Sequence, residues 1–215
     1  MEITPTSRTT IKRLAEKTVV DRDTIYAILD EGLIAHVAWA DESGQPFVIP
    51  TGYARDGDRI LFHGSSGAGM FRALAAGAPT CATITLLDGM VLARSAFESS
   101  MHYRSVVILG KCEVLEGDEK VAALDVITDR MLPERRATLR PMLKKEIAAT
   151  LILALPLTEL SAKVSAGQPS DEGDDINFPV WAGVVPIKTV FESPIPADNL
   201  APEFQTIPDY ISRWK

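Results

Sequence analysis

Hydrophobic and polar positions alternate in short runs through the first half of the chain. Three apolar runs, 33–39, 46–53 and 59–63, are joined by the polar, glycine-containing segments 41–44 and 55–58. Joints of this length and composition are typical of β-hairpins, and they are too short to hold a crossover helix. The pattern therefore predicts an antiparallel meander.

The stretch 88–110 is the most informative part of the chain. It places a polar and cationic segment between two apolar runs, Met90–Ala93 and Val106–Leu109, which are bounded by Gly89 and Gly110. Runs rich in Val, Ile and Leu with such boundaries are typical of strands. We therefore predict two strands of one sheet joined by a polar connection, and connections carry function more often than the scaffold does.

Further strands are predicted at 80–86, 160–166 and within 178–187. In the second of these the residues on one side of the strand are Leu160, Ala162, Val164 and Ala166. An acidic segment, Ser170–Asp175, precedes the last strand and is predicted to be a loop.

Helical spacing appears in separate segments. Between 20 and 32, Asp21 can cap a helix, Gly32 can end it, and the apolar face is Ile25, Ile28 and Leu29. Between 118 and 150, two helical repeats are separated by Pro133, and they consist of Val121, Leu124, Ile127 and Met131, then of Leu143, Ile147 and Leu151.

These elements predict a mainly β fold, an antiparallel barrel of six or more strands with a few peripheral helices. One domain covers residues 20–192, preceded by an N-terminal arm, 1–19. A proline-rich C-terminal arm, 193–215, is expected to lack regular structure and either to wrap a neighbour or to fray.

Net charge, cysteine content and the lengths of the apolar runs indicate which binding partners and which cellular location to expect. The chain carries a net charge of −7 with a pI near 5.0, which argues against nucleic-acid binding. Cys81 and Cys112 lack metal-ligand spacing and are interpreted as small buried hydrophobes in a reducing compartment. The longest apolar run, 147–157, is too short to span a membrane, and residues 1–17 contain no signal-peptide core. We therefore predict a cytoplasmic protein without membrane contact.

The Gly/Ser-rich loop after Phe62 is the first candidate for chemistry. It leads from a predicted strand into a short helix closed by Gly77. Small residues and free amides favour a phosphate, although such a joint is also a common structural element. The loop lacks the lysine of a nucleoside-triphosphate loop and the spacing of a dinucleotide fingerprint, so a mononucleotide is the favoured ligand.

Three motifs in this order resemble the pyridoxamine 5'-phosphate oxidase-like family of FMN-binding split barrels. They are Asp88–Phe97, Ser100–Val107 and Val180–Val184, and the similarity extends from about Thr10 to Phe191. Within the family, the sequence is most similar to the flavin-nucleotide-binding branch near the nitroimidazole-resistance reductases. The resemblance implies an antiparallel split β-barrel that forms a homodimer, with FMN in two clefts between the subunits.

The resemblance also implies a set of cofactor-binding residues. Ile49, Pro50 and Thr51 match the strand whose backbone meets the isoalloxazine ring, and Phe62, His63, Gly64, Ser65 and Ser66 match the strand end and phosphate loop. Arg104 and Ser105 match the strand that reaches the flavin from the partner subunit, and Trp181 matches the aromatic residue at the ring edge. The predicted set is completed by Met70, Arg94, Ser95 and Tyr103.

Two departures from the family pattern affect the expected chemistry. Relatives commonly carry Ser-Arg or Ser-Arg-Lys for the phosphate where this chain has Ala68, Gly69 and Met70, so phosphate binding would depend on backbone amides, Ser65, Ser66, Arg72 or Arg94. The authentic oxidases hold the substrate phosphate with an arginine where this chain has Val185. We therefore do not expect pyridoxamine phosphate to be the substrate.

Three functional hypotheses follow. The first is an FMN-dependent oxidoreductase that passes electrons from a reduced donor to a small-molecule acceptor, with His36, His63, His102 or Tyr103 as possible proton donors. The second is a flavin-storage or sensing module without turnover. The third is a haem-binding split barrel that uses a histidine ligand. The first hypothesis fits a chain without a Ser-His-Asp set, paired acid/base motif or metal-ligand spacing.

Overall fold

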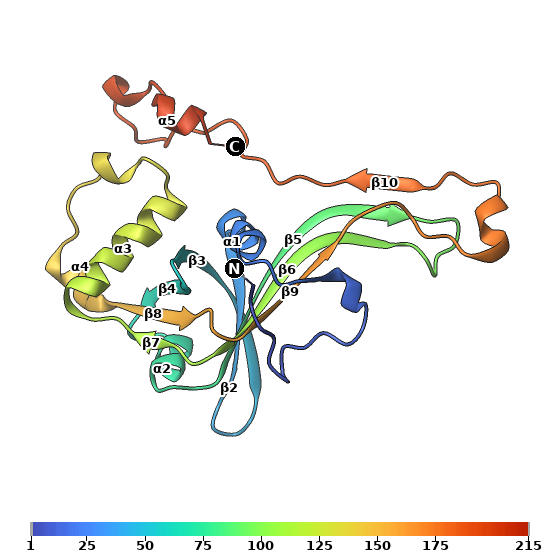
Figure 1. Ribbon diagram of the computed structural model, residues 1–215. Helices are drawn as coiled ribbons and strands as arrows, with labels where there is room; N and C mark the ends of the chain where they lie inside the picture. Colours follow the sequence, from blue (N-terminus) through green and yellow to red (C-terminus); the bar gives the residue numbers. More distant parts are fainter. Residues whose placement is uncertain (1, 215) are drawn as a thin grey trace.

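The computed structural model describes residues 2–214, and within them ten strands form one antiparallel sheet accompanied by short helices (Figure 1). The strands are β1 (Thr18–Val19), β2 (Ile34–Ala40), β3 (Pro46–Asp56), β4 (Arg59–Ser65), β5 (Thr80–Leu92), β6 (Ser100–Gly110), β7 (Glu113–Val114), β8 (Thr150–Pro156), β9 (Leu160–Ser165) and β10 (Gly183–Pro186). The α-helices are α1 (Arg22–Glu31), α2 (Gly69–Ala75), α3 (Gly117–Met131), α4 (Lys144–Ala149) and α5 (Asp209–Ser212). The predicted mainly β, antiparallel architecture with peripheral helices is confirmed.

The strand order is β1-β9-β6-β5-β2-β3-β4-β8-β7, with β10 paired to β5. The sheet splits between β3 and β4. Residues 46–52 of β3 pair with β2, whereas only residues 53–56 pair with β4. Beyond Phe62, β4 continues to Ser65 along β8 alone. We call the place where these two strands diverge the fork.

Alternation along the strands divides the apolar residues between two cores. Tyr53, Phe62 and Ile84 lie inside the barrel with the apolar face of α1. Leu61 and Ile152 point to the opposite face, where α3 covers them with residues such as Ile127. Because successive side chains point to opposite faces, β4 is buried on both sides over residues 60–62.

Helix α1 begins and ends where the sequence predicts. The Asp21 carboxylate accepts a hydrogen bond from the Thr24 amide at 2.9 Å, and Ile25, Ile28 and Leu29 are buried. Gly32 ends the helix with an ordinary φ of −64°, so a left-handed conformation does not explain the glycine. A Cβ there would lie 2.6 Å from the Tyr53 hydroxyl and 2.7 Å from Ile84 Cγ2. The glycine is therefore required by space.

Gly32→Ala is expected to lower the free energy of unfolding by about 1–3 kcal/mol, because the new methyl group overpacks a buried site. The hydrogen bond from the Tyr53 hydroxyl to the Leu29 carbonyl, 2.5 Å long, holds one of the clashing atoms in place. Urea unfolding measures the effect. Gly69→Ala is the matched control, since a Cβ at that position has no described atom within 4 Å apart from its chain neighbours and the backbone of its own helix. Equal stabilities of the two variants would contradict this account.

Several predicted boundaries are wrong. Strand β6 begins at Ser100, so His102, Tyr103, Arg104 and Ser105 lie within a strand rather than in the connection. Helix α4 ends at Ala149, which places Leu151 in β8, and Ala166 follows β9 and is exposed. The tail is also more regular than predicted, because it contains a 3-10 turn, Pro202–Phe204, and the single-turn α5.

The outer halves of β5 and β6, residues 87–103, extend away from the barrel together with β10 (Figure 1). We call this three-stranded part the projection. A register shift between Leu87 and Gly89 marks where it begins. After β10 the chain returns toward α3, where Tyr210 accepts a hydrogen bond from Arg135 at 3.1 Å and Arg213 pairs with Glu134 at 2.7 Å.

Both cysteines are free thiols. Cys112 is buried, and burial raises the pKa of its thiol to about 11, while Cys81 is half-buried. Cys112 therefore fits the interpretation as a small buried hydrophobe. As for membrane contact, the described residues include no helix that combines the length and apolar character needed to cross a bilayer.

Candidate functional site

The fork brings together one group of predicted site residues. Ile49, Pro50 and Thr51 lie on its β3 branch, and His63 and Gly64 lie on its β4 branch. In residues 2–214 no strand pairs with the inner edge of either branch. The sheet therefore leaves backbone groups at this edge unpaired, although the Ile49 carbonyl accepts a hydrogen bond of 3.5 Å from the Thr51 hydroxyl. Ile49 is 41% exposed.

The loop after β4 provides hydroxyl groups and little positive charge. Ser65 and Ser66 are exposed, and the Ser66 amide is already used by the Ala149 carbonyl at 3.0 Å. Helix α2 follows with Ala68 as an N-cap that offers no side-chain hydrogen bond. The missing phosphate ligands at Ala68, Gly69 and Met70 are thus not replaced by a cation within the loop.

Three of the predicted cofactor-binding residues in this region have a role in packing. The side chains of Phe62 and Met70 are buried inside the barrel, so the prediction that they contact a cofactor holds at most for their backbone atoms. Gly64 lies against the ring of Phe71, where a Cβ would approach to 2.2 Å. The glycine in the predicted phosphate motif is therefore required by helix packing.

His63 stands out on the β4 branch. It lies opposite Ile152 in the sheet register, its imidazole is half-buried, and its buried Nδ1 has no hydrogen-bond partner in the described part of the chain. Burial lowers the pKa of His63 below its usual 6.5. A neutral imidazole with an unused nitrogen is suited to ligate a metal or to accept a proton.

The segment between α3 and α4 runs from the β3 branch of the fork to the end of β4. It begins beside the fork, where Met131 packs 3.4 Å from the Cβ position of Gly52. It ends at α4, next to Thr150, which pairs with Ser65. Met131, Leu139, Met142 and Leu143 in this segment are all exposed. The segment thus carries exposed apolar side chains, and its two ends lie at the two branches of the fork.

The stability of the unliganded protein is expected to fall as the pH drops below about 6.5. Because the pKa of His63 is lowered in the folded state, the unfolded chain binds a proton that the folded chain does not, and acidification favours unfolding. His63→Gln removes this contribution between pH 7.5 and 5.5. Chemical unfolding at several pH values measures it, and a wild-type pH dependence in His63→Gln would contradict this assignment.

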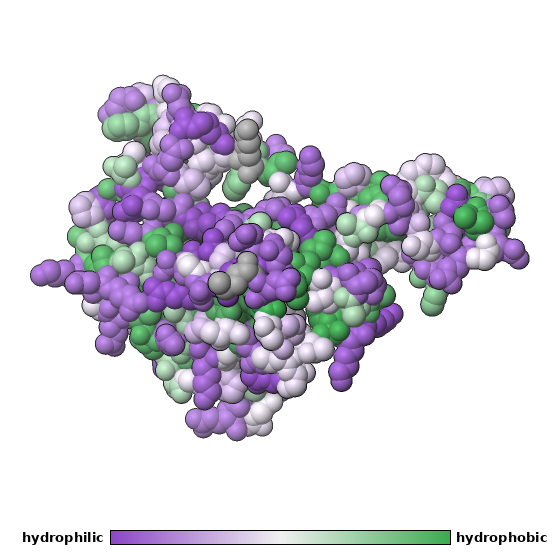
Figure 2. Space-filling view, in the orientation of Figure 1, coloured by the Kyte–Doolittle hydropathy of each residue, from purple (hydrophilic) through white to green (hydrophobic). Residues whose placement is uncertain are grey.

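The projection carries the second group of predicted residues. Trp181 precedes β10, packs against Gly183 and is 67% exposed, which excludes a place in the core of this chain. Other large apolar side chains of the projection and of the residues just before β10 are also exposed, namely Leu87, Met90, Leu92, Phe97, Met101, Val180 and Val185. Figure 2 shows hydrophobic residues at the surface where the projection leaves the body. Such a surface is typical of a protein interface or a ligand site.

Arg94 and Ser95 hold the tip of the projection together. The Arg94 guanidinium and amide both bind the Asp171 carboxylate at 2.6 Å, and the Asp171 side chain is only 3% exposed. The Ser95 hydroxyl accepts a hydrogen bond from the Glu98 amide. The charge of Arg94 is neutralised by Asp171. Arg94 therefore does not replace the phosphate-binding side chains that are missing at Ala68, Gly69 and Met70.

Arg104 is similarly engaged. All three guanidinium nitrogens bind the carboxylates of Asp88 and Glu31, with distances from 2.5 to 2.9 Å. These hydrogen bonds raise the pKa of Arg104 and lower that of Glu31. Arg104 therefore links α1 to the base of the projection. The family resemblance, which assigns Arg104 to the flavin site, did not indicate this structural role.

Arg104→Met is expected to destabilise the fold by about 1 kcal/mol, because it leaves two partly exposed carboxylates close together without their cation. Thermal or urea unfolding measures the change. Arg136→Met is the matched control, since Arg136 also pairs with two carboxylates, Asp125 and Asp129, but is more exposed. A loss for Arg136→Met that equals or exceeds that for Arg104→Met would count against this role.

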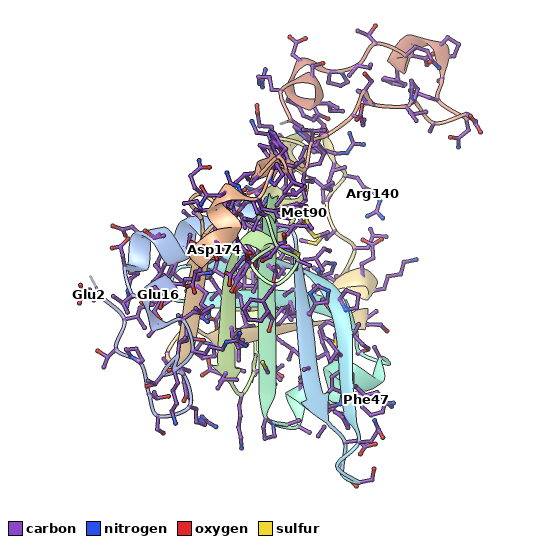
Figure 3. The ribbon with its side chains drawn as sticks, turned by 90° about the vertical axis from the view of Figure 1, so that its right-hand side faces the viewer. Glu2, Glu16, Phe47, Met90, Arg140 and Asp174 are labelled. Carbon is purple, nitrogen blue, oxygen red and sulfur yellow. The ribbon has the colours of Figure 1, made fainter. Side chains whose placement is uncertain are left out.

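The two groups lie far apart in one chain. Ile49 is aligned through β2 with Ala82 of β5, whereas Trp181 lies beyond Leu92, ten residues further along β5. At about 3.3 Å per residue, they are separated by about 30 Å. In Figure 3, Phe47 of β3 and Met90 of β5 likewise lie in different parts of the molecule. A single chain therefore cannot close one ligand site from both groups.

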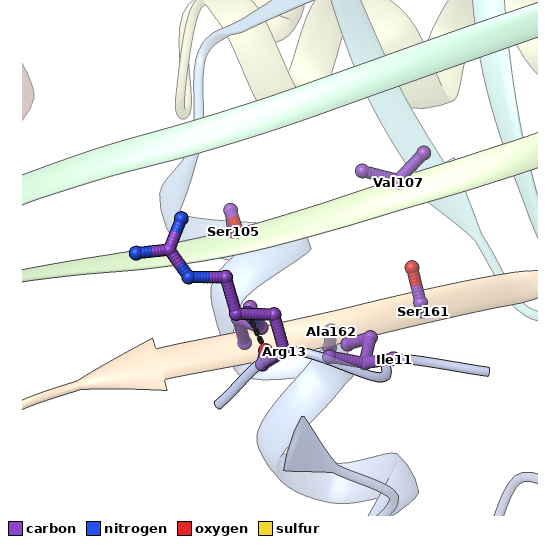
Figure 4. Close-up of a pocket in the computed structure, with 7 residues that line it drawn as sticks. Ile11, Arg13, Ser105, Val107, Ser161 and Ala162 are labelled. Carbon is purple, nitrogen blue, oxygen red and sulfur yellow. Dashed lines mark hydrogen bonds between the residues drawn. The ribbon is translucent and has the colours of Figure 1, made fainter. Parts of the chain in front are cut away.

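Tyr103 and Ser105 lie at the base of the projection. Ser105 lines a pocket of about 340 Å³ on the outer face of β6 and β9, together with Arg13 and Lys163 (Figure 4). Sequence reasoning missed both cations, because they come from segments 150 residues apart and neither belongs to a motif. Within residues 2–214 no cluster of three or more His, Cys, Asp or Glu could hold a metal ion.

Comparisons with known proteins bear on the family and the fold. The family model for pyridoxamine 5'-phosphate oxidase matches residues 21–164. An FAD- and haem-binding protein from Mycobacterium smegmatis is 42% identical, with a TM-score of 0.87 over 91% of this chain and 96% of that one. The flavocytochrome Anf3 from Azotobacter vinelandii is 38% identical, with a TM-score of 0.92 over 99% of both chains.

A third structure supports the fold alone. A Bacteroides thetaiotaomicron protein thought to confer 5-nitroimidazole resistance is 23% identical, with a TM-score of 0.58 over 68% of this chain and 86% of that one. No curated protein matches the chain significantly.

Proposed function

Because the chain belongs to the pyridoxamine 5'-phosphate oxidase family, we propose that it is a flavin-binding redox protein whose site forms between two copies of the chain. The observation that carries the proposal is the distance of about 30 Å between the fork and Trp181. Two copies related by a two-fold axis would place the projection of each against the fork of the other. The exposed apolar residues of the projection would then be covered.

The flavin that fits best is FAD. FMN, the flavin that the resemblance implies, ends in a phosphate dianion, and the loop after β4 offers it only the hydroxyls of Ser65 and Ser66, with Arg72 one turn further on. The family member from M. smegmatis is described as binding FAD. Chromatography of the extracted cofactor distinguishes the two flavins.

The chain's own residues would bind and orient the flavin. A bound flavin supplies the hydride and single-electron chemistry itself. The free backbone groups of the fork can hydrogen-bond the polar edge of a flat heterocycle, and the exposed Trp181 ring can pack on its apolar surface. Val185 offers no charge to a substrate phosphate, so we propose a small acceptor other than pyridoxamine phosphate.

His63 supports a second cofactor, haem. Its imidazole is neutral at pH 7, its Nδ1 is unused, and exposed Met and Leu side chains lie in the neighbouring segment between α3 and α4. These are the features of a haem ligand in an apolar setting. The two relatives at 42% and 38% identity are an FAD- and haem-binding protein and a flavocytochrome. Bound haem would supply single-electron exchange.

The absorption spectrum of the purified protein, recorded before and after adding FAD, FMN and haemin, tests the proposal. We expect protein-bound flavin bands, with FAD bound more tightly than FMN, and a Soret band when haem is present. Bleaching of the flavin by NADH or NADPH, followed by recovery with an acceptor, would support the redox role. A reduced flavin that no acceptor reoxidises would favour storage or sensing, and a protein that binds no flavin would refute the proposal.

A further inference from the structure

The pocket beside Ser105 is built from two strands and the N-terminal arm. Its floor consists of two directly opposed pairs on the outer face of the sheet, Ser105 with Lys163 and Val107 with Ser161. Arg13 forms one wall, and Figure 4 shows its side chain extending from the N-terminal segment across β9 toward the level of Ser105. Hydroxyls and cations thus share one concave surface.

The N-terminal wall is fixed in place. Lys163 Nζ donates a hydrogen bond to the Arg13 carbonyl at 2.7 Å, and Lys17 Nζ donates one to the Ser165 hydroxyl at 3.1 Å. Further along, Arg8 pairs with Glu159, and β1 pairs with β9. Contacts on both sides of Arg13 therefore hold the backbone of this segment against the sheet.

The charge of the pocket is positive although the chain as a whole is acidic. Most arginines pair with a carboxylate, as Arg94 and Arg104 do, but the Arg13 guanidinium has no such partner in the described residues. Lys163 adds a second cation, and none of the carboxylates in residues 2–214 lines the pocket. An unpaired guanidinium that shares a pocket with the hydroxyls of Ser105 and Ser161 is suited to bind phosphate oxygens.

We propose that this pocket binds the pyrophosphate of an ADP-containing ligand. A volume of about 340 Å³ lies in the range of small-molecule sites, and Val107 offers an apolar surface for the nucleoside. Two sources share this chemistry, namely the ADP half of FAD and a nicotinamide dinucleotide donor. The first source rests on the proposed function, because Ser105 is the residue that the resemblance assigns to the flavin site.

ADP itself is the probe. Calorimetric titration of the full chain is expected to show binding that Arg13→Gln weakens about tenfold, since one charge-assisted contact is lost. Ser161→Asp, which adds a carboxylate to the pocket, is expected to weaken it at least as much. Lys12→Gln is the control, because it removes the same charge from the same segment outside the pocket. Thermal unfolding verifies that the variants are folded.

A competition experiment separates the two sources. If excess FAD prevents ADP binding, the pocket serves the flavin, and if ADP binds equally to FAD-loaded protein, it serves a nicotinamide donor. Either result supports an ADP site. The proposal is overturned if ADP does not bind the wild-type chain, or if Arg13→Gln binds it as the wild type does. A failure of FAD and FMN to bind, with ADP binding intact, would refute only the proposed function.

Discussion

Replacing His63 with alanine is expected to abolish the Soret band of haem-loaded protein while the flavin bands remain. The imidazole is the only described histidine side chain with a buried nitrogen that lacks a partner, and burial lowers its pKa, which keeps it neutral at pH 7. A neutral imidazole nitrogen is the form that binds iron. Removing it leaves no comparable ligand on β4, so we expect haem affinity to fall by more than a hundredfold.

Haemin titration followed at the Soret maximum measures the loss. His36→Ala and His102→Ala are the matched controls, since these histidines lie on other strands, β2 and β6. His63→Gly with added imidazole offers a second readout, because a small ligand in the vacated space should restore part of the band. If His63→Ala binds haem as the wild type does, or if either control variant loses the Soret band, His63 is not the haem-iron ligand.

Much of the barrel was predictable because its signals are local. Hairpin joints at 41–44 and 55–58 lie within a few residues of the strands that they connect, and the Asp21 cap precedes the apolar face of α1. The three motifs also identified the family correctly. By contrast, the length of β6 was not predictable. In the projection both faces of the strand are exposed, so apolar and polar residues do not alternate as they do in a strand with one buried face.

The roles of individual site residues depended on contacts distant in sequence. Arg94 is neutralised by Asp171, 77 residues away, and Arg104 by Glu31, 73 residues away. Arg13 reaches its pocket because contacts on both sides of it, among them the pairing of β1 with β9, hold the N-terminal segment in place. Position in a motif does not reveal such partners. Matching residues to a family pattern therefore located the fork and the projection, whereas it could not show which cations remain free for a ligand.

Two variants that each lose flavin binding are expected to recover it when mixed, if the site is shared between copies. Ile49→Glu places a charge on the fork and Trp181→Glu places one on the projection, and both positions are exposed in the single chain, so folding should be preserved. In a mixed dimer one site carries both changes and the other carries neither. Random exchange makes half of the dimers mixed, so about a quarter of all sites should bind flavin.

Flavin absorbance of a doubly tagged, co-expressed mixture measures the recovery, and sedimentation verifies that the variants still form dimers. Ile49→Gln and Trp181→Leu repeat the test with changes that perturb association less. A site built within one chain predicts no recovery at all, because every chain then carries a defect. Recovery near a quarter would therefore establish both the dimer and the pairing of fork with projection, and its absence among confirmed dimers would refute that pairing.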